Sequence, residues 1–330
     1  MQENEKKVLL QIEDVKQYFP VKKTHFREKQ KYVKANDGIS LDIYEGETFG
    51  LVGESGCGKS TFGQMLVHLL DPSGGKILLN GRDITRPARR ERKDLCKQMQ
   101  IVFQDPYSSI DPNKTIGWLV EEPLRIHGIG KTKQERDEKV SQVLKAVGLD
   151  ESYRTRWPNE LSGGQRQRVA IAIALILDPD FVVCDEPVSA LDVSVQAQML
   201  NLLADLQRAQ GLTYVLISHD LGVVRHSADR VCVMFLGRVC EVGPTQALFS
   251  APRHPYTKFL LDSVPRPDPT RRGESGPPLA GEIPSPVHPP SGCRFRTRCP
   301  YAQDICAQTV PPLTGAGDHQ AACHFPLGRA

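Results

Sequence analysis

The segment Gly53–Ser60 carries glycines, a lysine and a hydroxyl at a spacing suited to binding phosphate groups. It reads GESGCGKS and fits the pattern G-x-x-x-x-G-K-[ST]. The short apolar run before it, Thr48–Val52, predicts a strand, and Lys59 begins a predicted helix that runs to Leu70. Glycines allow successive backbone N–H groups to converge on phosphate oxygens, and the start of the helix adds positive potential. The loop therefore predicts a nucleoside triphosphate as ligand.

Two side chains of this loop have specific expected roles. Lys59 is expected to reach the β- and γ-phosphates, and the hydroxyl of Ser60 is expected to ligate Mg²⁺. The other contacts are expected mainly from backbone amides. The residues predicted to bind the nucleotide are Gly53, Glu54, Ser55, Gly56, Cys57, Gly58, Lys59, Ser60 and Thr61.

An acidic pair follows a second apolar run. Phe181–Cys184 reads FVVC, and Asp185 and Glu186 come directly after it. A buried parallel strand that ends in a carboxylate places that group at the carboxyl edge of the sheet, beside the phosphate loop. Asp185 is therefore predicted to hold Mg²⁺, usually through water, and Glu186 to orient or deprotonate an attacking water. Neighbouring strand residues project to opposite sides, which would give the two carboxylates different roles.

A second anion-binding surface is predicted upstream of the acidic pair, where Leu161–Gln165 reads LSGGQ. Ser162 is a good N-terminal cap for a strong helix predicted over Gln165–Leu177. The glycine pair, Gly163 and Gly164, allows backbone amides to approach an anion closely. The residues of this segment predicted to bind phosphate are Ser162, Gly163, Gly164 and Gln165.

Four of the nine cysteines lie in one short stretch, at Cys293, Cys299, Cys306 and Cys323. Disulfides are disfavoured in a reducing compartment. Structural Zn²⁺ sites commonly use closer cysteine pairs, and the spacing also differs from the run found in bacterial ferredoxins. The spacing therefore leaves Zn²⁺ and an iron–sulfur cluster open for a four-thiolate site, with four free thiols as the remaining alternative.

The elements that must position these residues alternate between strand and helix patterns. Apolar runs predict the strands, and helical spacing of apolar residues predicts a helix over Val193–Ala209. This interleaving predicts an α/β domain with a largely parallel sheet. The predicted strands are Ile39–Ile43, Thr48–Val52, Phe181–Cys184, Thr213–Ile217, Val231–Phe235 and Arg238–Val242.

Composition divides the chain further. Residues 1–250 carry the α/β pattern, and a stretch within them, about 105–168, predicts an inserted helical subdomain because it holds helix formers and no convincing strand over Thr115–Asn159. Residues 251–330 form a Pro/Cys-rich C-terminal extension with fifteen of the 25 prolines, so Pro265–Pro290 is predicted to be mostly extended. The extension has too few apolar residues to form much core unaided, and a bound metal would compensate for that.

Composition also excludes several classes of protein. The chain has 330 residues, 39% of them hydrophobic and 25% charged, and a formal net charge of +3. These values exclude wholesale disorder and a collagen-like fibre, and the charge is too small to predict a nucleic-acid partner. The longest apolar run, Val169–Leu177, is about half of the ~18 residues that span a membrane. The polar N-terminus, MQENEKK, lacks the apolar segment of a secretion signal, so we expect a cytosolic chain.

The motifs, in this order, resemble the ATP-binding subunits of ABC transporters from Val8 to about Phe249. The resemblance implies a P-loop ABC-type ATPase core that binds ATP and Mg²⁺. It implies that LSGGQ binds the γ-phosphate held by the phosphate loop of another subunit, so that two ATP molecules lie between a head-to-tail pair. Ser189–Asp192, which reads SALD, resembles the loop that crosses the interface of that pair.

The same resemblance assigns roles to further positions. Gln104 is expected to ligate or sense Mg²⁺ and the attacking water, and to link the core to the helical subdomain. His219 is expected to contact the γ-phosphate. Phe19 is expected to stack on adenine, with Tyr18 as the alternative.

The extension points to one group within this family. His254–Thr257 reads HPYT and, together with Phe103–Ser109 and Asp185–Asp192, resembles the second of the two ATPase types in oligopeptide/dipeptide importers. The resemblance implies ATP hydrolysis that powers peptide import from the cytoplasmic face of the cell (inner) membrane. The implied partners are a second homologous ATPase subunit, two transmembrane permease subunits and an extracytoplasmic peptide-binding protein. For the ATPase pair, the resemblance favours a heterodimer over a homodimer. Because members of this group carry the same cysteine set and bind a [4Fe-4S] cluster, it is favoured over Zn²⁺.

Other functions stay open at this point. Related importers move other small solutes, such as nickel chelates or glutathione. A soluble ABC ATPase that acts on ribosomes or DNA is a further alternative, although such proteins commonly fuse two cassettes or insert coiled coils. This chain has one phosphate loop, one LSGGQ and no long heptad insert. A further alternative is a metal-sensing or redox regulatory role in addition to transport, which only the cysteines of the extension suggest.

Overall fold

The computed structural model describes residues 6–23, 25, 29–264 and 281–328. Most of the predicted extended segment Pro265–Pro290 lies outside these ranges. The strands are β1 (Val8–Pro20), β2 (Tyr32–Tyr44), β3 (Thr48–Val52), β4 (Gly74–Leu79), β5 (Arg82–Asp83), β6 (Met99–Val102), β7 (Phe181–Asp185), β8 (Thr213–Ile217), β9 (Arg230–Phe235), β10 (Arg238–Pro244), β11 (Thr314–Ala316) and β12 (His319–Ala321).

Helices of varied length connect these strands. Two short 3-10 helices, η1 (Glu151–Thr155) and η2 (Pro158–Glu160), lie among them. The α-helices are α1 (Lys59–Leu66), α2 (Arg89–Gln98), α3 (Pro106–Ser109), α4 (Ile116–His127), α5 (Lys133–Ala146), α6 (Gly163–Leu175), α7 (Val193–Gln210), α8 (Leu221–Ser227), α9 (Thr245–Ser250), α10 (Pro255–Asp262) and α11 (Ile305–Gln308).

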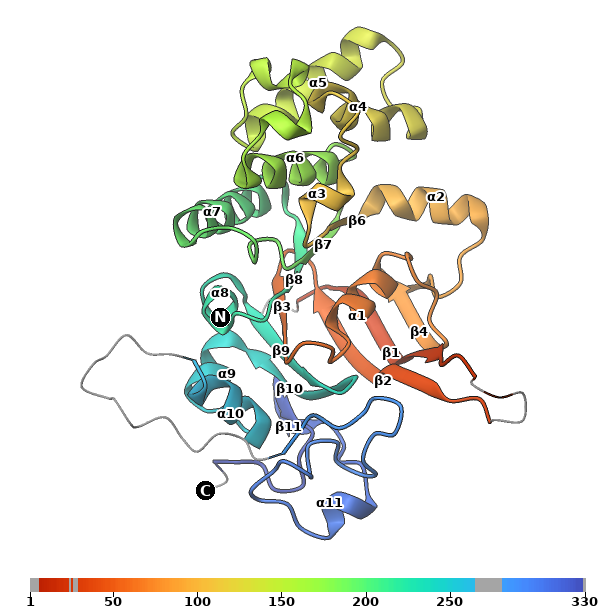
Figure 1. Cartoon of the computed structure of the whole chain (residues 1–330), viewed down its shortest axis with the longest axis vertical. Coiled ribbons are helices and arrows are strands. Elements are labelled where there is room, and N and C mark those ends of the chain that lie inside the picture. Colours follow the sequence, from red (N-terminus) through yellow and green to blue (C-terminus); the bar gives the residue numbers. More distant parts are fainter. Residues whose placement is uncertain (1–5, 24, 26–28, 265–280, 329–330) are drawn as a thin grey trace, which may run out of the picture.

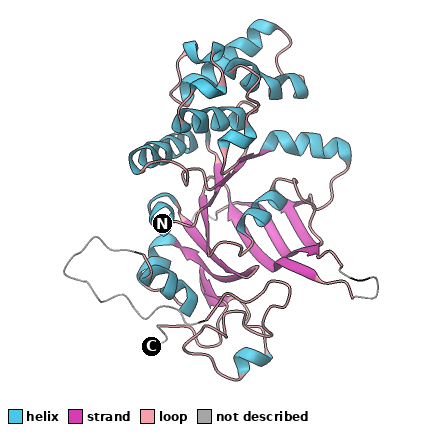
Figure 2. Cartoon of the chain, in the orientation of Figure 1, coloured by secondary structure: helices cyan, strands magenta, loops and turns pink. Residues whose placement is uncertain are grey.

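Two sheets form the centre of the molecule, as Figure 2 shows. The smaller sheet is antiparallel and has the order β2-β1-β4-β5. The larger sheet has the order β11-β12-β10-β9-β3-β8-β7-β6, and the strands from β9 to β6 pair in parallel. The predicted α/β class and the largely parallel sheet are therefore confirmed.

The central strands are buried on both faces. Every residue of β3, β7 and β8 is buried, which explains why their sequences are apolar runs rather than alternating patterns. The strand prediction over Ile39–Ile43 is too short, because β2 pairs with β1 along its length. The helix predicted to reach Leu70 ends at Leu66, and His68 beyond it has a left-handed φ of 57°.

Between β6 and β7, where every residue is described, the chain forms helices and no strand. Figure 1 shows α4, α5 and α6 together at the top of the molecule, away from the smaller sheet. The absence of strands over Thr115–Asn159 is as predicted. The proposed limits of this subdomain, about 105–168, stay a prediction.

The C-terminal extension packs on the α/β core. Its strands β11 and β12 form a hairpin that pairs with β10 and so lengthens the larger sheet, which the sequence did not predict. Tyr256 and Phe295 are buried against Phe235 of β9, with ring centroids 4.8 and 5.4 Å from the Phe235 centroid. The extension therefore shares the core of the larger domain. Within the described ranges, no helix combines the length and apolar character needed to cross a membrane.

Candidate functional site

The phosphate loop joins β3 to α1, as its sequence predicts. Gly53 has a φ of 152°, and a Cβ added there would lie 2.2 Å from the carbonyl oxygen of Met234. Gly58 has a φ of 102°, and its Cβ would lie 2.2 Å from the carbonyl oxygen of Ala35. Both backbone conformation and space therefore require glycine at these two positions.

The lysine of the loop is held inside it. Lys59 is 6% exposed, and its Nζ donates to the carbonyl oxygens of Gly53 at 2.8 Å and Glu54 at 3.3 Å. Cys57 is buried beside it, and burial raises the pKa of the Cys57 thiol. On the solvent side of the loop, Ser55 and Ser60 are exposed. The cation therefore lies within the loop, where it can meet phosphate groups that approach from the exposed side.

Two predicted Mg²⁺ ligands, Ser60 of the loop and Asp185 of the acidic pair, are in contact. The Ser60 hydroxyl donates to Oδ1 of Asp185 over 3.0 Å. Asp185 is 6% exposed, and burial raises its pKa above the usual value; the neighbouring Glu186 adds to the rise, while the Ser60 hydrogen bond and Lys59 oppose it. A hydroxyl and a carboxylate are hard oxygen donors of the kind that Mg²⁺ prefers. The donor set therefore fits this ion.

Glu186 lies at the centre of a second cluster. Its Oε2 accepts a hydrogen bond from Nε2 of Gln104 at 2.8 Å and lies 3.1 Å from Nδ1 of His219. These three residues follow β6, β7 and β8, which are neighbours in the sheet. Gln104 therefore contacts Glu186 rather than the Ser60–Asp185 pair, although it was also predicted as a Mg²⁺ ligand.

The two carboxylates point to different partners, but the predicted reason is wrong. Alternation along a strand does not apply, because β7 ends at Asp185 and Glu186 lies beyond it. Glu186 instead has a left-handed φ of 48°, while its backbone N–H donates to the carbonyl oxygen of Ile217 at 2.9 Å. Such backbone strain in a non-glycine residue is common at functional sites.

The LSGGQ segment lies at the start of α6. Ser162 caps this helix: its Oγ accepts from the N–H of Gln165 at 3.4 Å, and its own N–H donates to Oε1 of Gln165 at 2.9 Å. Gln165 Nε2 also donates to the hydroxyl of Tyr153 at 2.8 Å. Figure 1 shows α6 among the upper helices and α1 lower, beside the smaller sheet. The structure does not bring the segment Ser162–Gln165 to the phosphate loop of its own chain.

The two candidate aromatics for adenine lie next to each other on β1. The Tyr18 hydroxyl donates to Asp37, and burial together with that hydrogen bond raises the pKa of Tyr18 to about 12. Phe19 is half-buried and pairs with Val33 of β2. The hydroxyl of Tyr18 is therefore already engaged, whereas the assignment of Phe19 to adenine stays a prediction.

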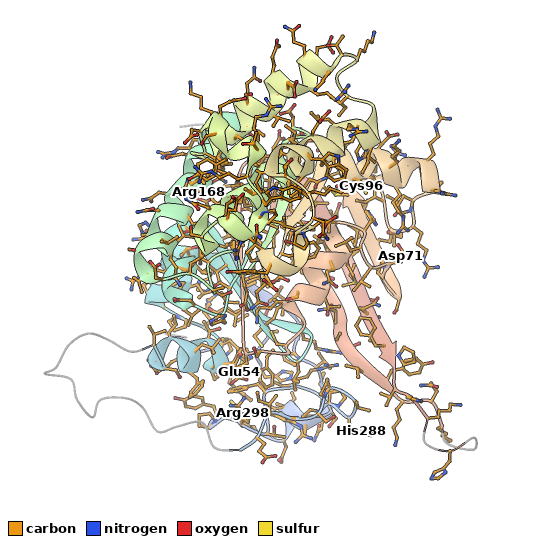
Figure 3. All side chains as sticks on the ribbon, turned by 45° about the horizontal axis from the view of Figure 1, so that its top comes forward. Glu54, Asp71, Cys96, Arg168, His288 and Arg298 are labelled. Atoms are coloured by element: carbon orange, nitrogen blue, oxygen red, sulfur yellow. The ribbon has the colours of Figure 1, made fainter. Side chains whose placement is uncertain are left out.

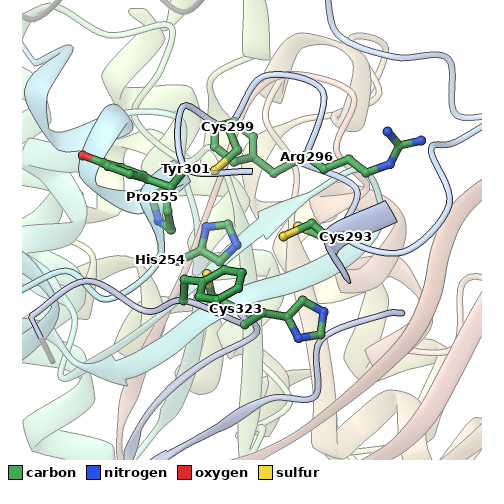
Figure 4. A pocket seen from close by; sticks show the side chains of 11 residues that line it. His254, Pro255, Cys293, Arg296, Cys299, Tyr301 and Cys323 are labelled. Atoms are coloured by element: carbon green, nitrogen blue, oxygen red, sulfur yellow. The ribbon is translucent and has the colours of Figure 1, made fainter. Parts of the chain in front are cut away.

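The four clustered cysteines line one cavity of about 10 Å³, together with His254 and aromatic side chains of the extension (Figure 4). Burial raises the pKa of the Cys293 and Cys299 thiols, and that of Cys323 to about 11. A set of four thiols suits a soft metal centre. Among the described residues, however, no group of three or more His, Cys, Asp or Glu side chains is arranged so that it would hold a metal ion. The donor types therefore fit a metal, while their spacing in this structure does not.

Sequence reasoning missed two residues that contact the phosphate loop from the extension. The hydroxyl of Tyr256 accepts the N–H of Glu54 at 3.0 Å. The guanidinium of Arg298 pairs with the Glu54 carboxylate, 2.9 Å from Nη1 to Oε2. Figure 3 labels Glu54 and Arg298. Because the two partners are 244 positions apart in the sequence, no local pattern could reveal this pair.

Comparisons with known proteins agree with this geometry. A family model described as "ABC transporter" matches residues 36–189, and one described as "Oligopeptide/dipeptide transporter, C-terminal region" matches residues 240–306. The chain is 48% identical to the oligopeptide transport ATP-binding protein AppF of Bacillus subtilis, over 96% of this chain and 97% of AppF. It is also 48% identical to the oligopeptide transport ATP-binding protein OppF of Salmonella typhimurium, over 97% and 96% of the two chains.

Solved structures show the same fold. One is titled as a dimeric post-hydrolysis state of the ATP-binding cassette MJ0796 bound to ADP and Pi. It superposes with a TM-score of 0.63 at 30% identity, over 72% of this chain and 99% of that one. Another, cbiO1 from Clostridium perfringens, has a TM-score of 0.64 at 29% identity, over 74% and 91% of the two chains. The chain is therefore an ABC-type ATPase and belongs to the oligopeptide transport ATP-binding proteins of the ABC transporter family.

Proposed function

We propose that this chain powers the import of peptides across the cytoplasmic membrane by hydrolysing ATP. The observation that carries the proposal is the meeting of Gln104, Glu186 and His219 beside the Ser60–Asp185 pair, at the ends of adjacent strands. Similarity to oligopeptide transport proteins over nearly the full length favours peptide transport over a soluble ATPase that acts on ribosomes or DNA. Another small solute, such as a nickel chelate or glutathione, is the alternative cargo.

Each residue of the site has a proposed task in hydrolysis. The backbone of Gly53–Thr61 and the ammonium of Lys59 bind the phosphates, while Ser60 and Asp185 hold Mg²⁺. Bound Mg²⁺ supplies positive charge that offsets the charge on the phosphate oxygens. Glu186 orients the attacking water and accepts its proton. Gln104 and His219 fix the Glu186 carboxylate through the contacts described above. His219 also contacts the γ-phosphate, and Phe19 stacks on adenine.

Completion of the site requires a second ATPase subunit. The residues Ser162, Gly163, Gly164 and Gln165 are proposed to contact the nucleotide held by the partner subunit. The separation of α6 from α1 within one chain supports this arrangement. The related MJ0796 cassette is titled as dimeric. We propose that the partner is a homologous subunit in a heterodimer, and that the pair serves two permeases and an extracytoplasmic peptide-binding protein from the cytoplasmic face of the membrane.

The test is the substitution Glu186→Gln. Loss of the general base is expected to lower ATP turnover by roughly 100-fold or more. Nucleotide binding should persist, and the ATP-bound dimer should accumulate because it no longer resolves by hydrolysis. Turnover is measured as phosphate release, and dimer mass by light scattering in the presence of ATP and Mg²⁺. Hydrolysis at a near-normal rate would contradict the role of Glu186.

We also propose that Cys293, Cys299, Cys306 and Cys323 bind a [4Fe-4S] cluster, with Zn²⁺ as the alternative. Their position around one small cavity supports a shared ligand. The cavity of about 10 Å³ has room for about one water, and the described thiols are not arranged to hold a metal, so binding a cluster would require them to change position.

A further inference from the structure

Two residues of the C-terminal extension contact Glu54 of the phosphate loop. The backbone N–H of Glu54 donates to the hydroxyl of Tyr256, which lies on α10 and is itself fully buried. The carboxylate of Glu54 pairs with Arg298, which directly precedes Cys299. Both contacts come from the C-terminal extension, more than 200 residues along the chain.

The ion pair involves both terminal nitrogens of Arg298 and both carboxylate oxygens of Glu54. Arg298 Nη1 lies 3.2 and 2.9 Å from the two carboxylate oxygens of Glu54, and Nη2 lies 3.3 Å from Oε1. The Arg298 side chain is 8% exposed and that of Glu54 is 21% exposed. Such a two-pronged, shielded pair fixes orientation as well as charge, unlike a single contact at the surface.

The backbone of Glu54 connects this pair to the lysine of the loop. The carbonyl oxygen of Glu54 accepts from Lys59 Nζ at 3.3 Å and from the N–H of Cys57 at 3.2 Å. Movement of Glu54 would therefore move groups that shape the loop around Lys59. A second consequence is electrostatic, because an unpaired Glu54 carboxylate would stand in a loop built to receive phosphate anions.

We infer that Arg298 and Tyr256 are positioning residues of the ATP site, which act through Glu54. Tyr256 fixes the backbone of the loop, and Arg298 neutralises and orients the one acidic side chain within Gly53–Ser60. The inference rests on the proposed function, in which this loop binds ATP. It makes the extension part of the nucleotide site as well as of the core.

The experiment measures nucleotide affinity and turnover in the full chain, purified with its partner subunits. Arg298→Ala is expected to raise the Kd for ADP with Mg²⁺ and the KM for ATP by about tenfold, the size of a lost charged hydrogen bond. The kcat should change less than about twofold, because neither residue contacts the Gln104–Glu186–His219 cluster. Tyr256→Phe removes only a hydroxyl and should raise the Kd for ADP and the KM for ATP by less than Arg298→Ala does.

Matched controls separate positioning from general damage. Lys258→Ala removes an exposed cation of the same extension, which pairs with Asp262 at 3.0 Å. Tyr214→Phe removes a buried hydroxyl that has no hydrogen-bond partner among the described residues. Both controls should keep normal Kd and KM. Arg298→Lys, which retains the charge, should recover part of the affinity; this variant and Tyr256→Phe carry the test if Arg298→Ala fails to fold.

A double-mutant cycle shows whether Arg298 acts through Glu54. In a Glu54→Gln background, Arg298→Ala should raise Kd by less than about twofold, because no carboxylate is left unpaired. The inference would be overturned if Arg298→Ala raised the Kd equally in both backgrounds. It would also be overturned if the folded Arg298→Ala and Tyr256→Phe variants had the same Kd as the controls. If Lys59→Ala also left Kd unchanged, the proposed function would fail as well; if it abolished binding, only the inference would fail.

Discussion

At the scale of single residues, the site is built at a cost in stability. Asp185 is buried at the end of β7 with another carboxylate, Glu186, directly after it. Glu186 has a left-handed backbone conformation that disfavours residues with a side chain. Neither feature serves packing: the Asp185 carboxylate contacts Ser60 of the phosphate loop, and the Glu186 carboxylate contacts Gln104 and His219. The strain and the charge therefore fit the chemistry proposed for this site rather than a need of the fold.

Asp185→Asn is predicted to stabilise the nucleotide-free chain while it abolishes Mg²⁺-dependent hydrolysis. The folded pKa of Asp185 is raised, so the folded state binds its proton more tightly than the unfolded state does. Stability from this group is present at low pH and is lost as pH rises through the folded pKa. At pH 7 the variant should therefore melt at a higher temperature than the parent chain.

The measurement is a set of thermal melts from pH 7 downwards, with phosphate release assayed in parallel. The gain in melting temperature should shrink as the pH approaches the ordinary pKa of an aspartate. The Asn side chain can still accept the Ser60 hydroxyl, so that contact is preserved. A variant that melts lower than its parent at pH 7 would show that ionised Asp185 supports the fold.

At the scale of elements, the sequence predicted the parts that carry a local signal. The strands β3 and β8 have the predicted bounds, because each is a short apolar run buried on both faces. The phosphate loop was predicted between its strand and its helix. In contrast, β11 and β12 are three residues each, TGA and HQA. They owe their strand form to pairing, β11 with β12 and β12 with β10, rather than to any periodicity.

Side chains that meet across the fold were partly predictable. The resemblance to ABC transporter subunits, rather than any spacing, assigned Gln104 and His219 to the site of Glu186, and their contacts follow from the strand order β6-β7-β8. The pairing of Arg298 with Glu54 had no such guide. It depends on how the described part of the C-terminal extension packs against β9 and β10, which no short pattern encodes.

The cysteine segment makes a prediction of its own. Cys299→Ser should remove the proposed metal centre, because a four-thiolate site loses one of its ligands. Iron and zinc are measured by elemental analysis, together with visible absorption of the freshly purified parent chain. Iron with visible absorption supports the cluster, and zinc without colour supports Zn²⁺.

The matched control for this prediction is Cys96→Ser. Cys96 lies half-buried on α2, far along the chain from the cavity, and should leave the metal content unchanged. Parent protein prepared without oxygen that contains neither metal would refute both assignments. Metal retained in full by Cys299→Ser would exclude this residue as a ligand.

At the scale of the whole molecule, the two segments proposed to bind phosphate lie in different parts of the fold. The phosphate loop lies beside the smaller sheet, whereas the LSGGQ segment begins α6 among the upper helices (Figure 1). Hydrogen bonds of Ser162 stay within its own helix cap. The proposed ATP site needs both segments, so a second chain has to complete it, and this supports the proposal that hydrolysis depends on assembly.

Ser162→Arg is predicted to separate the two halves. The isolated chain should bind ATP with normal Kd, because Ser162 does not approach its own phosphate loop. Turnover of the assembled ATPase pair should fall by roughly 100-fold, because a bulky side chain replaces a group proposed to contact the partner's γ-phosphate. Thr132→Ala, which removes the cap of α5, serves as control for a lost helix cap because the Thr132 hydroxyl accepts from Glu135 in the same way. Reduced ATP affinity in the isolated Ser162→Arg chain would mean that the segment acts within its own subunit, and the two-subunit site would have to be abandoned.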